Sequence, residues 1–212
     1  MLIVVMLVAA CLVGSIPTAV IAGRLLKGID IRTTGSGNAG ATNAARALGF
    51  GPGLAVAAVD VAKGLAAVLL VSRIAPLPGS MGPVLCAVAA VAGHVFPVFA
   101  GFRGGKGVAT SAGAAIAIFP ILAPFCLLFF LLAAALSRRV VVASLTAALA
   151  LPALYLVSFA FGAVFDPWRM AFAAAVFLIA VFTHRSNIAR LLRGEEKKLD
   201  LKAMLHRRSQ GR

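Results

Sequence analysis

The stretch GFRGGKGVAT, residues 101–110, places two cations among four glycines between two apolar segments. Glycines let backbone N–H groups turn toward an anion, and a helix expected to begin at Val108 would add the positive end of its dipole. The pattern predicts a phosphate site. Its candidate ligands are Arg103, Lys106 and the backbone of Gly104, Gly105 and Gly107.

This stretch is not a nucleotide-binding Walker loop. Ala100 stands where that motif needs a glycine, and Gly107 stands where it needs a serine or threonine. The simpler alternative is a cationic anchor at the membrane surface. An anchor explains the charge but gives no reason for the glycines.

Another polar stretch, DIRTTGSGNAGATNAARALG, covers residues 30–49 and contains the formal pattern GxGxxG. In chain order it is the first polar stretch, and residues 101–110 form the second. A dinucleotide fold needs a strand before that pattern, whereas here a helix end precedes it, so we reject the match. An ordinary polar turn is the alternative to an anion site. The candidate ligands are Ser36, Gly37, Asn38, Thr42, Asn43 and Arg46, with a helix beginning near residue 41.

A third polar stretch, THRSNIARLLRGEEKK, follows the last apolar segment. His184 and Asn187 are three residues apart, so one helical face can present both. A solvated basic tail accounts for the residues beyond Arg193 but leaves His184 and Asn187 unexplained.

The composition indicates that an integral membrane protein positions these stretches. Of 212 residues, 62% are hydrophobic, and the mean hydropathy is +1.04. The formal charge of +14 favours anionic lipid or anionic substrates as partners. Nucleic acid is excluded as a partner, because the cations are spread over loops and the phenylalanines lie in apolar runs. The three cysteines lie in apolar segments without a CxxC spacing, so we expect no metal site.

Five apolar stretches are long enough to cross a bilayer as helices. They are residues 2–23, 53–72, 81–100, 140–163 and 168–183. The first lacks a basic leader region, so we expect a retained span rather than a signal peptide. Residues 108–136 would make a helix of about 44 Å, too long for one span, and Pro120 and Pro124 interrupt them.

The distribution of cations decides how residues 108–136 fold. If they form two short helices turning near Pro120, the chain has seven transmembrane helices, and seventeen of its 20 lysines and arginines lie on one face. The positive-inside rule then predicts an N-terminus outside and a cytoplasmic C-terminus. All three polar stretches fall on the cytoplasmic face. We expect an all-α membrane protein with one domain, residues 1–198, and a cytoplasmic basic tail, residues 199–212. The C-terminal stretch from residue 193 to residue 212 is expected to form a short helix or a frayed end.

Several catalytic arrangements are absent from the sequence. There is no paired carboxylate for acid–base work, no HExxH and no GxSxG. Asp60, in an apolar segment, precedes Lys63 by three residues, which favours a structural ion pair over a proton relay.

Four motifs together resemble a known family. GSIPTAVIAGRLLKGIDIRTTGSGNAGATNAARALG, DVAKG, GHVFPVFAGFRGGKGVAT and HRSNIARLLRGEEKK are similar to the bacterial acyl-phosphate:glycerol-3-phosphate acyltransferases, the PlsY family. The resemblance extends from Gly14 to Lys198, and one departure is Arg103, where many relatives have lysine. It implies a seven-helix enzyme of the bacterial inner membrane with its site on the cytoplasmic side.

The resemblance also implies the reaction. The family transfers a fatty acyl group from acyl phosphate to the 1-hydroxyl of sn-glycerol 3-phosphate, giving lysophosphatidic acid and phosphate, without a cofactor or metal. The implied partners are acyl phosphate, glycerol 3-phosphate, membrane lipid and the enzyme that forms acyl phosphate.

Together with the residue chemistry, the resemblance gives expected roles. Ser36, Gly37 and the backbone of residues 104–107 would hold phosphate oxygens, with Lys106 as the main cation. A second group would hold glycerol 3-phosphate, and it consists of Thr42, Arg46, His184 and Asn187. Ser144 resembles a serine of the family. The base is either His184 or the acceptor's own phosphate, and no covalent acyl-enzyme is expected.

Other classes of protein remain as rivals on the sequence alone. A transporter for a phosphorylated solute would suit basic loops, but three polar stretches on one face do not match a midplane site. An acyltransferase that uses acyl-CoA or acyl carrier protein would need the HxxxxD motif. Phe99 and Ala189 stand where its aspartate would follow His94 or His184. A purely structural protein would have no use for glycine-rich cationic loops.

Overall fold

The computed structural model describes residues 1–199, and helices are the only regular secondary structure within that range. The long helices are α1 (Leu2–Ser15), α4 (Phe50–Leu69), α5 (Met81–Val95), α6 (Val108–Ile118), α7 (Leu122–Ser137), α8 (Val140–Ser158) and α9 (Pro167–Thr183). Shorter α-helices are α2 (Thr18–Lys27), α3 (Ala41–Leu48) and α10 (Arg185–Leu192). Single 3₁₀ turns are η1 (Ile31–Thr33), η2 (Val71–Ile74), η3 (Val98–Ala100) and η4 (Phe159–Phe161).

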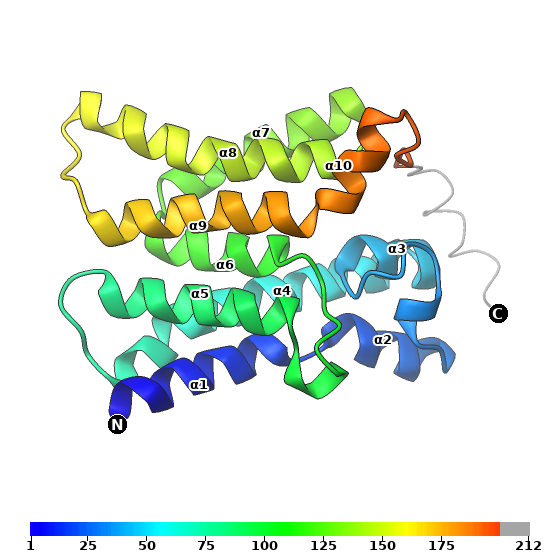
Figure 1. Cartoon of the computed structure of the whole chain (residues 1–212), viewed down its shortest axis with the longest axis horizontal. Coiled ribbons are helices and arrows are strands. Elements are labelled where there is room, and N and C mark those ends of the chain that lie inside the picture. Colours follow the sequence, from blue (N-terminus) through cyan, green and yellow to red (C-terminus); the bar gives the residue numbers. More distant parts are fainter. Residues whose placement is uncertain (200–212) are drawn as a thin grey trace.

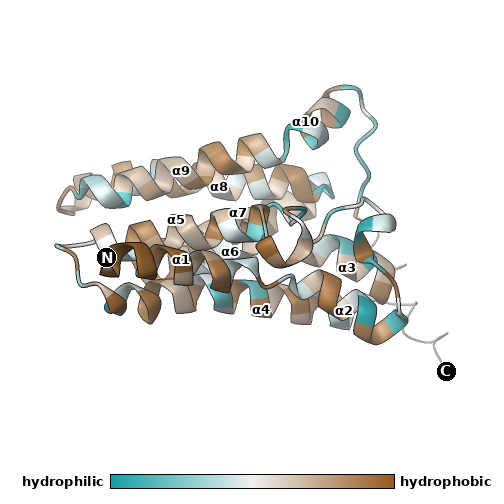
Figure 2. Cartoon of the chain, turned by 60° about the horizontal axis from the view of Figure 1, so that its bottom comes forward, coloured by the Kyte–Doolittle hydropathy of each residue, from teal (hydrophilic) through white to brown (hydrophobic). Residues whose placement is uncertain are grey.

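The long helices lie side by side along one axis and alternate in direction (Figure 1). The chain begins at one end of this bundle. The opposite end carries α2, α3, α10 and the segment between α5 and α6, and we call it the cationic end. Figure 2 shows hydrophilic residues concentrated there, around α2, α3 and α10, while the long helices are mostly hydrophobic.

The bundle is that of a multi-pass membrane protein. Four segments are long and apolar enough to cross a bilayer: Leu2–Lys27, Phe50–Ile74, Met81–Ala100 and Val140–Phe161. The pair α9 and α10, bent by 60°, would add a fifth, while α6 and α7 are shorter apolar helices. Length and composition therefore identify four or five of the seven expected spans.

Three expectations about helix limits can be compared with the structure. Residues 108–136 do form two helices, separated at Phe119–Ile121, as Pro120 predicts. The first segment is not one continuous helix, because α1 ends at Ser15 and α2 begins at Thr18. Pro17 explains this break, since it has no N–H to continue the ladder. The tail forms no helix between Arg193 and Leu199, and its remaining residues lie outside the described range.

Glycines bring two helix pairs into backbone contact. On α4 and α6, a side chain at Gly64 would overlap the carbonyl of Thr110, and one at Gly113 would overlap that of Val61. Gly14 and Gly93 do the same for α1 and α5. Membrane helices use small residues in this way because close packing replaces a hydrophobic driving force.

The end of the bundle where the chain begins is filled by aromatic side chains. Tyr155 packs edge-on against Phe119, with ring centroids 5.1 Å apart, and Phe119 stacks on Phe172. The Tyr155 hydroxyl accepts a hydrogen bond from the Asp166 N–H at 2.9 Å. This cluster holds the turn between α8 and α9 far from the cationic end.

Candidate active site

Lys106 lies where the second and third polar stretches meet. Its Nζ donates a short hydrogen bond to the side-chain oxygen of Asn187 on α10. The Asn187 amide donates to Glu196 at 2.7 Å, and the other Glu196 oxygen accepts from Arg190 at 2.9 Å. A carboxylate therefore orients the amide that contacts Lys106, without contacting Lys106 itself.

The surroundings of Lys106 favour the loss of its proton. Burial is the main cause that lowers the pKa of its ammonium, to about 8, and the charges of Arg190 and Arg46 lower it further. Glu196 acts in the opposite direction. Because Arg46 belongs to the first polar stretch, its influence on Lys106 indicates that all three stretches converge.

His184 occupies the bend between α9 and α10, just beyond the last turn of α9. Its side chain is 2% exposed, and its Nδ1 lies 2.8 Å from the Ala180 carbonyl. Burial and the Lys106 charge lower its pKa to about 4, so the ring is neutral near pH 7. With the proton on Nδ1 donated to that carbonyl, Nε2 keeps a lone pair. His184 is the N-cap of α10, and its carbonyl accepts a hydrogen bond from the Ile188 N–H at 2.8 Å, so it stands one turn before Asn187 at the start of the same helix.

The first polar stretch is shaped by its own side chains. Asn43 is 1% exposed, and its amide donates to the carbonyls of Ile31 at 2.8 Å and Thr34 at 3.0 Å. Its oxygen accepts from the Ser36 N–H at 2.8 Å. Both donor hydrogens of Asn43 are thus used within the stretch, which leaves none for a substrate.

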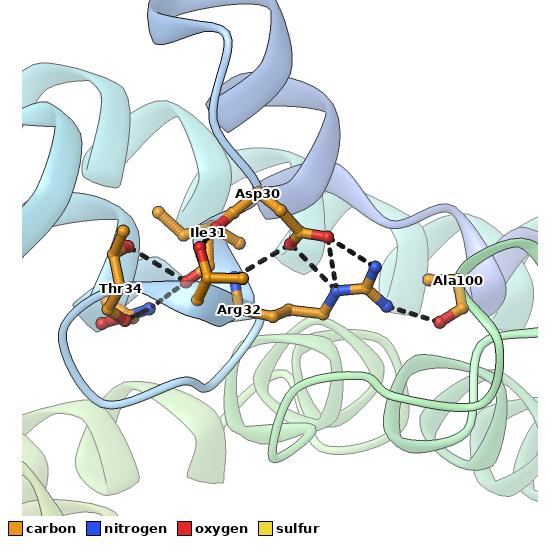
Figure 3. Close-up of polar contacts among 7 residues, drawn as sticks. Asp30, Ile31, Arg32, Thr34 and Ala100 are labelled. Carbon is orange, nitrogen blue, oxygen red and sulfur yellow. Dashed lines mark hydrogen bonds and ion pairs between the residues drawn. The ribbon is translucent and has the colours of Figure 1, made fainter.

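An ion-paired arginine of the first polar stretch is hydrogen-bonded to the residue directly before the second. Arg32 forms bonds with both carboxylate oxygens of Asp30, and its Nη1 donates to the Ala100 carbonyl at 2.6 Å (Figure 3). The hydrogen bonds from Arg32 lower the pKa of Asp30 to about 2. This pair stays charged at any physiological pH and ties the turn after α2 to η3.

The remaining sequence candidates lie at the same end but differ in exposure. Ser36 and Gly37 are exposed, Asn38, Thr42 and Arg46 are half-buried, and α3 begins at Ala41 as predicted. Gly104 and Gly105 pack against His94, whose carbonyl accepts from the Gly105 N–H at 3.2 Å. Gly107, with φ of 80°, directly precedes α6. Ser144 is buried in the second turn of α8.

The lining of an open groove of about 810 Å³ includes Arg103 of the glycine-rich stretch but neither Lys106 nor Asn187. Arg24, Arg32 and Arg103 supply positive charge to it. Its apolar and backbone lining comes from Ile16, Pro17, Val20, Ile21, Phe99, Ala100 and Gly101. Arg103 therefore faces a different space from the one that Lys106 and Asn187 share.

Sequence reasoning missed three members of this arrangement: Glu196, Arg190 and the Asp30–Arg32 pair. Glu196 was interpreted as part of a solvated tail, and only its position nine residues after Asn187, in a chain with six acidic residues, could have marked it. Asp60 and Lys63 do form the expected ion pair, at 2.8 Å. Within residues 1–199, no three His, Cys, Asp or Glu side chains gather as metal ligands would.

Comparisons with known proteins agree on one family. Residues 4–194 match the family model described as glycerol-3-phosphate acyltransferase. A glycerol-3-phosphate acyltransferase from Chlorobaculum tepidum is 44% identical, over 91% of this chain and 94% of that protein. One from Chlorobium phaeobacteroides strain BS1 is 43% identical, over 92% and 96%.

Solved structures give the same result. The crystal structure of PlsY (YgiH), an integral membrane glycerol 3-phosphate acyltransferase, in its glycerol 3-phosphate form is 34% identical with a TM-score of 0.81. Its lysophosphatidic acid form is 35% identical with a TM-score of 0.80, and each covers 96% of this chain and 98% of the crystallised chain. The chain belongs to the PlsY family of glycerol-3-phosphate acyltransferases.

Proposed function

We propose that this protein transfers a fatty acyl group from acyl phosphate to the 1-hydroxyl of sn-glycerol 3-phosphate, releasing lysophosphatidic acid and phosphate. The observation that carries the proposal is the convergence of Lys106, Asn187 and Arg46 at the polar end of an apolar bundle. Family membership supports the acceptor, because the similar crystal structures are of a glycerol 3-phosphate form and a lysophosphatidic acid form.

The Lys106 side of the site suits the acceptor. Glycerol 3-phosphate is small and doubly charged, and Lys106 and Arg46 offer it two cations beside the Asn187 amide. We assign the acceptor to Thr42, Arg46, His184 and Asn187. The phosphate oxygens are assigned to Ser36, Gly37, Asn38, Lys106 and the backbone of residues 104–107, and Ser144 would add a hydroxyl. Asn43 acts by holding the Ser36 turn rather than by binding substrate.

The groove beside Arg103 suits the donor. Acyl phosphate combines an anionic head with a long hydrocarbon chain. Arg24 and Arg103 offer charge to the head, while Ile16, Val20 and Ile21 line the same groove with apolar surface. An acyl donor dissolved in the bilayer would then approach from the α1–α2 side and the acceptor from the aqueous side.

The chemistry asks little of acid–base groups. The acceptor oxygen attacks the acyl carbonyl carbon, the bond to the phosphate oxygen breaks, and phosphate leaves with the electron pair. Because phosphate is a good leaving group, positioning and charge stabilisation supply most of the acceleration. The hydroxyl proton goes either to Nε2 of His184, which is neutral near pH 7, or to the acceptor's own phosphate.

The proposal places the enzyme in a bacterial inner membrane. The seven alternating helices would each cross it, with the N-terminus outside and the cationic end in the cytoplasm, as the positive-inside rule requires. Residues 1–198 would form one acyltransferase domain. The enzyme that makes acyl phosphate is a candidate partner.

The decisive experiment compares donors with purified protein and labelled glycerol 3-phosphate. We expect lysophosphatidic acid from acyl phosphate and none from acyl-CoA or acyl carrier protein. Lys106→Ala should reduce turnover by at least about a hundredfold while the protein remains folded, since a main phosphate contact is lost. Near-normal turnover in that variant would contradict the site assignment.

The base can be identified separately. If His184 accepts the proton, His184→Asn should lower kcat by about a hundredfold at every pH between 6 and 9. A variant that keeps most of its kcat over this range would assign the proton to the acceptor's phosphate instead.

A further inference from the structure

A side chain from α4 fills the break between α1 and α2. The Gly14 carbonyl would need the N–H of Thr18 to continue α1, but that N–H bonds the Ile16 carbonyl instead. Lys63 supplies the missing donor, with its Nζ 3.2 Å from the Gly14 oxygen and 2.8 Å from the Ile16 oxygen. The Lys63 side chain therefore supplies a donor to carbonyls at the C-terminal end of α1.

Asp60 links Thr18, at the start of α2, to the Lys63 ammonium. Its Oδ1 lies 2.8 Å from Lys63 Nζ and accepts a hydrogen bond from the Thr18 hydroxyl at 2.9 Å. The two charged side chains are only 4% and 2% exposed. Breaking a buried ion pair is costly, because removing one charged partner would leave the other charge uncompensated.

The same ammonium orients a histidine of α5. His94 Nδ1 lies 3.2 Å from Lys63 Nζ. An ammonium has only donors, so Nδ1 accepts and the ring proton sits on Nε2. That Nε2 lies against Gly105, where any side chain would overlap it, and the His94 carbonyl accepts from the Gly105 N–H. The imidazole ring and the backbone carbonyl of His94 thus both contact Gly105, the residue directly before Lys106.

We propose that Lys63 is a positioning residue for the phosphate-binding stretch. Its side chain acts through His94 and Gly105 to fix where Lys106 stands, and the ion pair with Asp60 holds it in place. Through these contacts, the break between α1 and α2 and the Asp60–Lys63 ion pair are connected to the glycine-rich stretch. The kinetic part of this inference rests on the proposed function, whereas the position of Gly105 does not.

The test uses a variant that removes both charges at once. Asp60→Leu/Lys63→Met replaces a buried pair by apolar side chains of similar size, a change that often leaves stability unaltered. Tyr155→Phe is the matched control, because it removes buried hydrogen bonds at the far end of the bundle. His94→Asn serves as a second variant. It keeps an acceptor for Lys63 and the backbone carbonyl of residue 94, but it removes the imidazole ring from Gly105.

Two measurements are made on full-length protein in detergent. Hydrogen exchange of the peptide containing Gly105 should be at least about tenfold faster in the double variant and in His94→Asn, and unchanged in Tyr155→Phe. The KM for glycerol 3-phosphate should rise by about tenfold in the first two variants, with kcat affected less, since ground-state phosphate binding is loosened.

Each outcome decides a different point. Wild-type exchange and KM in a folded double variant would overturn the positioning role. Equal losses in Tyr155→Phe would overturn it as well, by assigning the effect to general stability. If the double variant does not fold, His94→Asn decides by the same two readouts. An inactive wild-type protein would refute the proposed function, and the exchange measurement would still decide the inference.

Discussion

At the scale of single residues, Lys106 is held by an amide oxygen rather than by a carboxylate. Asn187 makes the contact, and Glu196 stands behind it. A direct lysine–glutamate pair would neutralise the charge and compete with an incoming phosphate. With the amide between them, Lys106 is fixed in place while its charge stays available to substrate.

This arrangement predicts how activity depends on pH. Burial lowers the pKa of Lys106 to about 8, so the ammonium is present below pH 8 and is lost above it. We expect kcat/KM for glycerol 3-phosphate to fall as the pH rises through about 8. A bound phosphate favours the charged form, so kcat should fall at a higher pH than kcat/KM does.

Lys106→Arg is the control for this assignment. A guanidinium stays protonated throughout the range, so the alkaline loss should disappear even if kcat is lower overall. Initial rates between pH 6.5 and about 9.5 provide the measurement. An identical alkaline limb in both proteins would assign it to another group.

At the scale of helices, the sequence predicts some boundaries better than others. Pro120 and the charge distribution predict the division into α6 and α7, because proline and charge are local signals. The break at Pro17 was missed, since it lies inside a long, mostly apolar stretch and its compensating donor, Lys63, comes from α4. The bend at His184 has no proline or glycine to mark it.

The glycine contacts between α4 and α6 predict a sharp difference between two positions. Gly113→Ala puts a methyl group onto the Val61 carbonyl, which should destabilise the protein by about 1–3 kcal/mol through forced separation of the helices. Gly51→Ala, in the first turn of α4, meets open space and should be neutral or stabilising by up to about 1 kcal/mol. Thermal unfolding in detergent compares them, and equal melting temperatures would contradict the packing argument.

At the scale of the whole molecule, the sequence predicted where the candidate site lies better than it predicted how the site is built. Charge alone placed three polar stretches at one end, where the structure also has them (Figure 1). The charge distribution could not show which side chains orient other groups. Asn43 and Glu196 orient other groups, and that role depends on partners six or more residues away.

The proposed orientation predicts which residues a membrane-impermeant thiol reagent reaches. Ala163, exposed after η4, lies at the end where the chain begins, and Ser186, exposed on α10, lies at the cationic end. In intact cells, Ala163→Cys should be labelled, and Ser186→Cys should be labelled only after lysis. The wild-type chain, with Cys11, Cys86 and Cys126, gives the background. The reverse pattern would invert the topology.

The gathering of every polar stretch at one end of the bundle also bears on the membrane itself. Under the proposed function, each turnover adds one newly acylated lipid to the leaflet nearest the cationic end and none to the other. Growth of the bilayer would then begin as an imbalance of area between its two faces. A separate process that moves lipids from one leaflet to the other must relieve it.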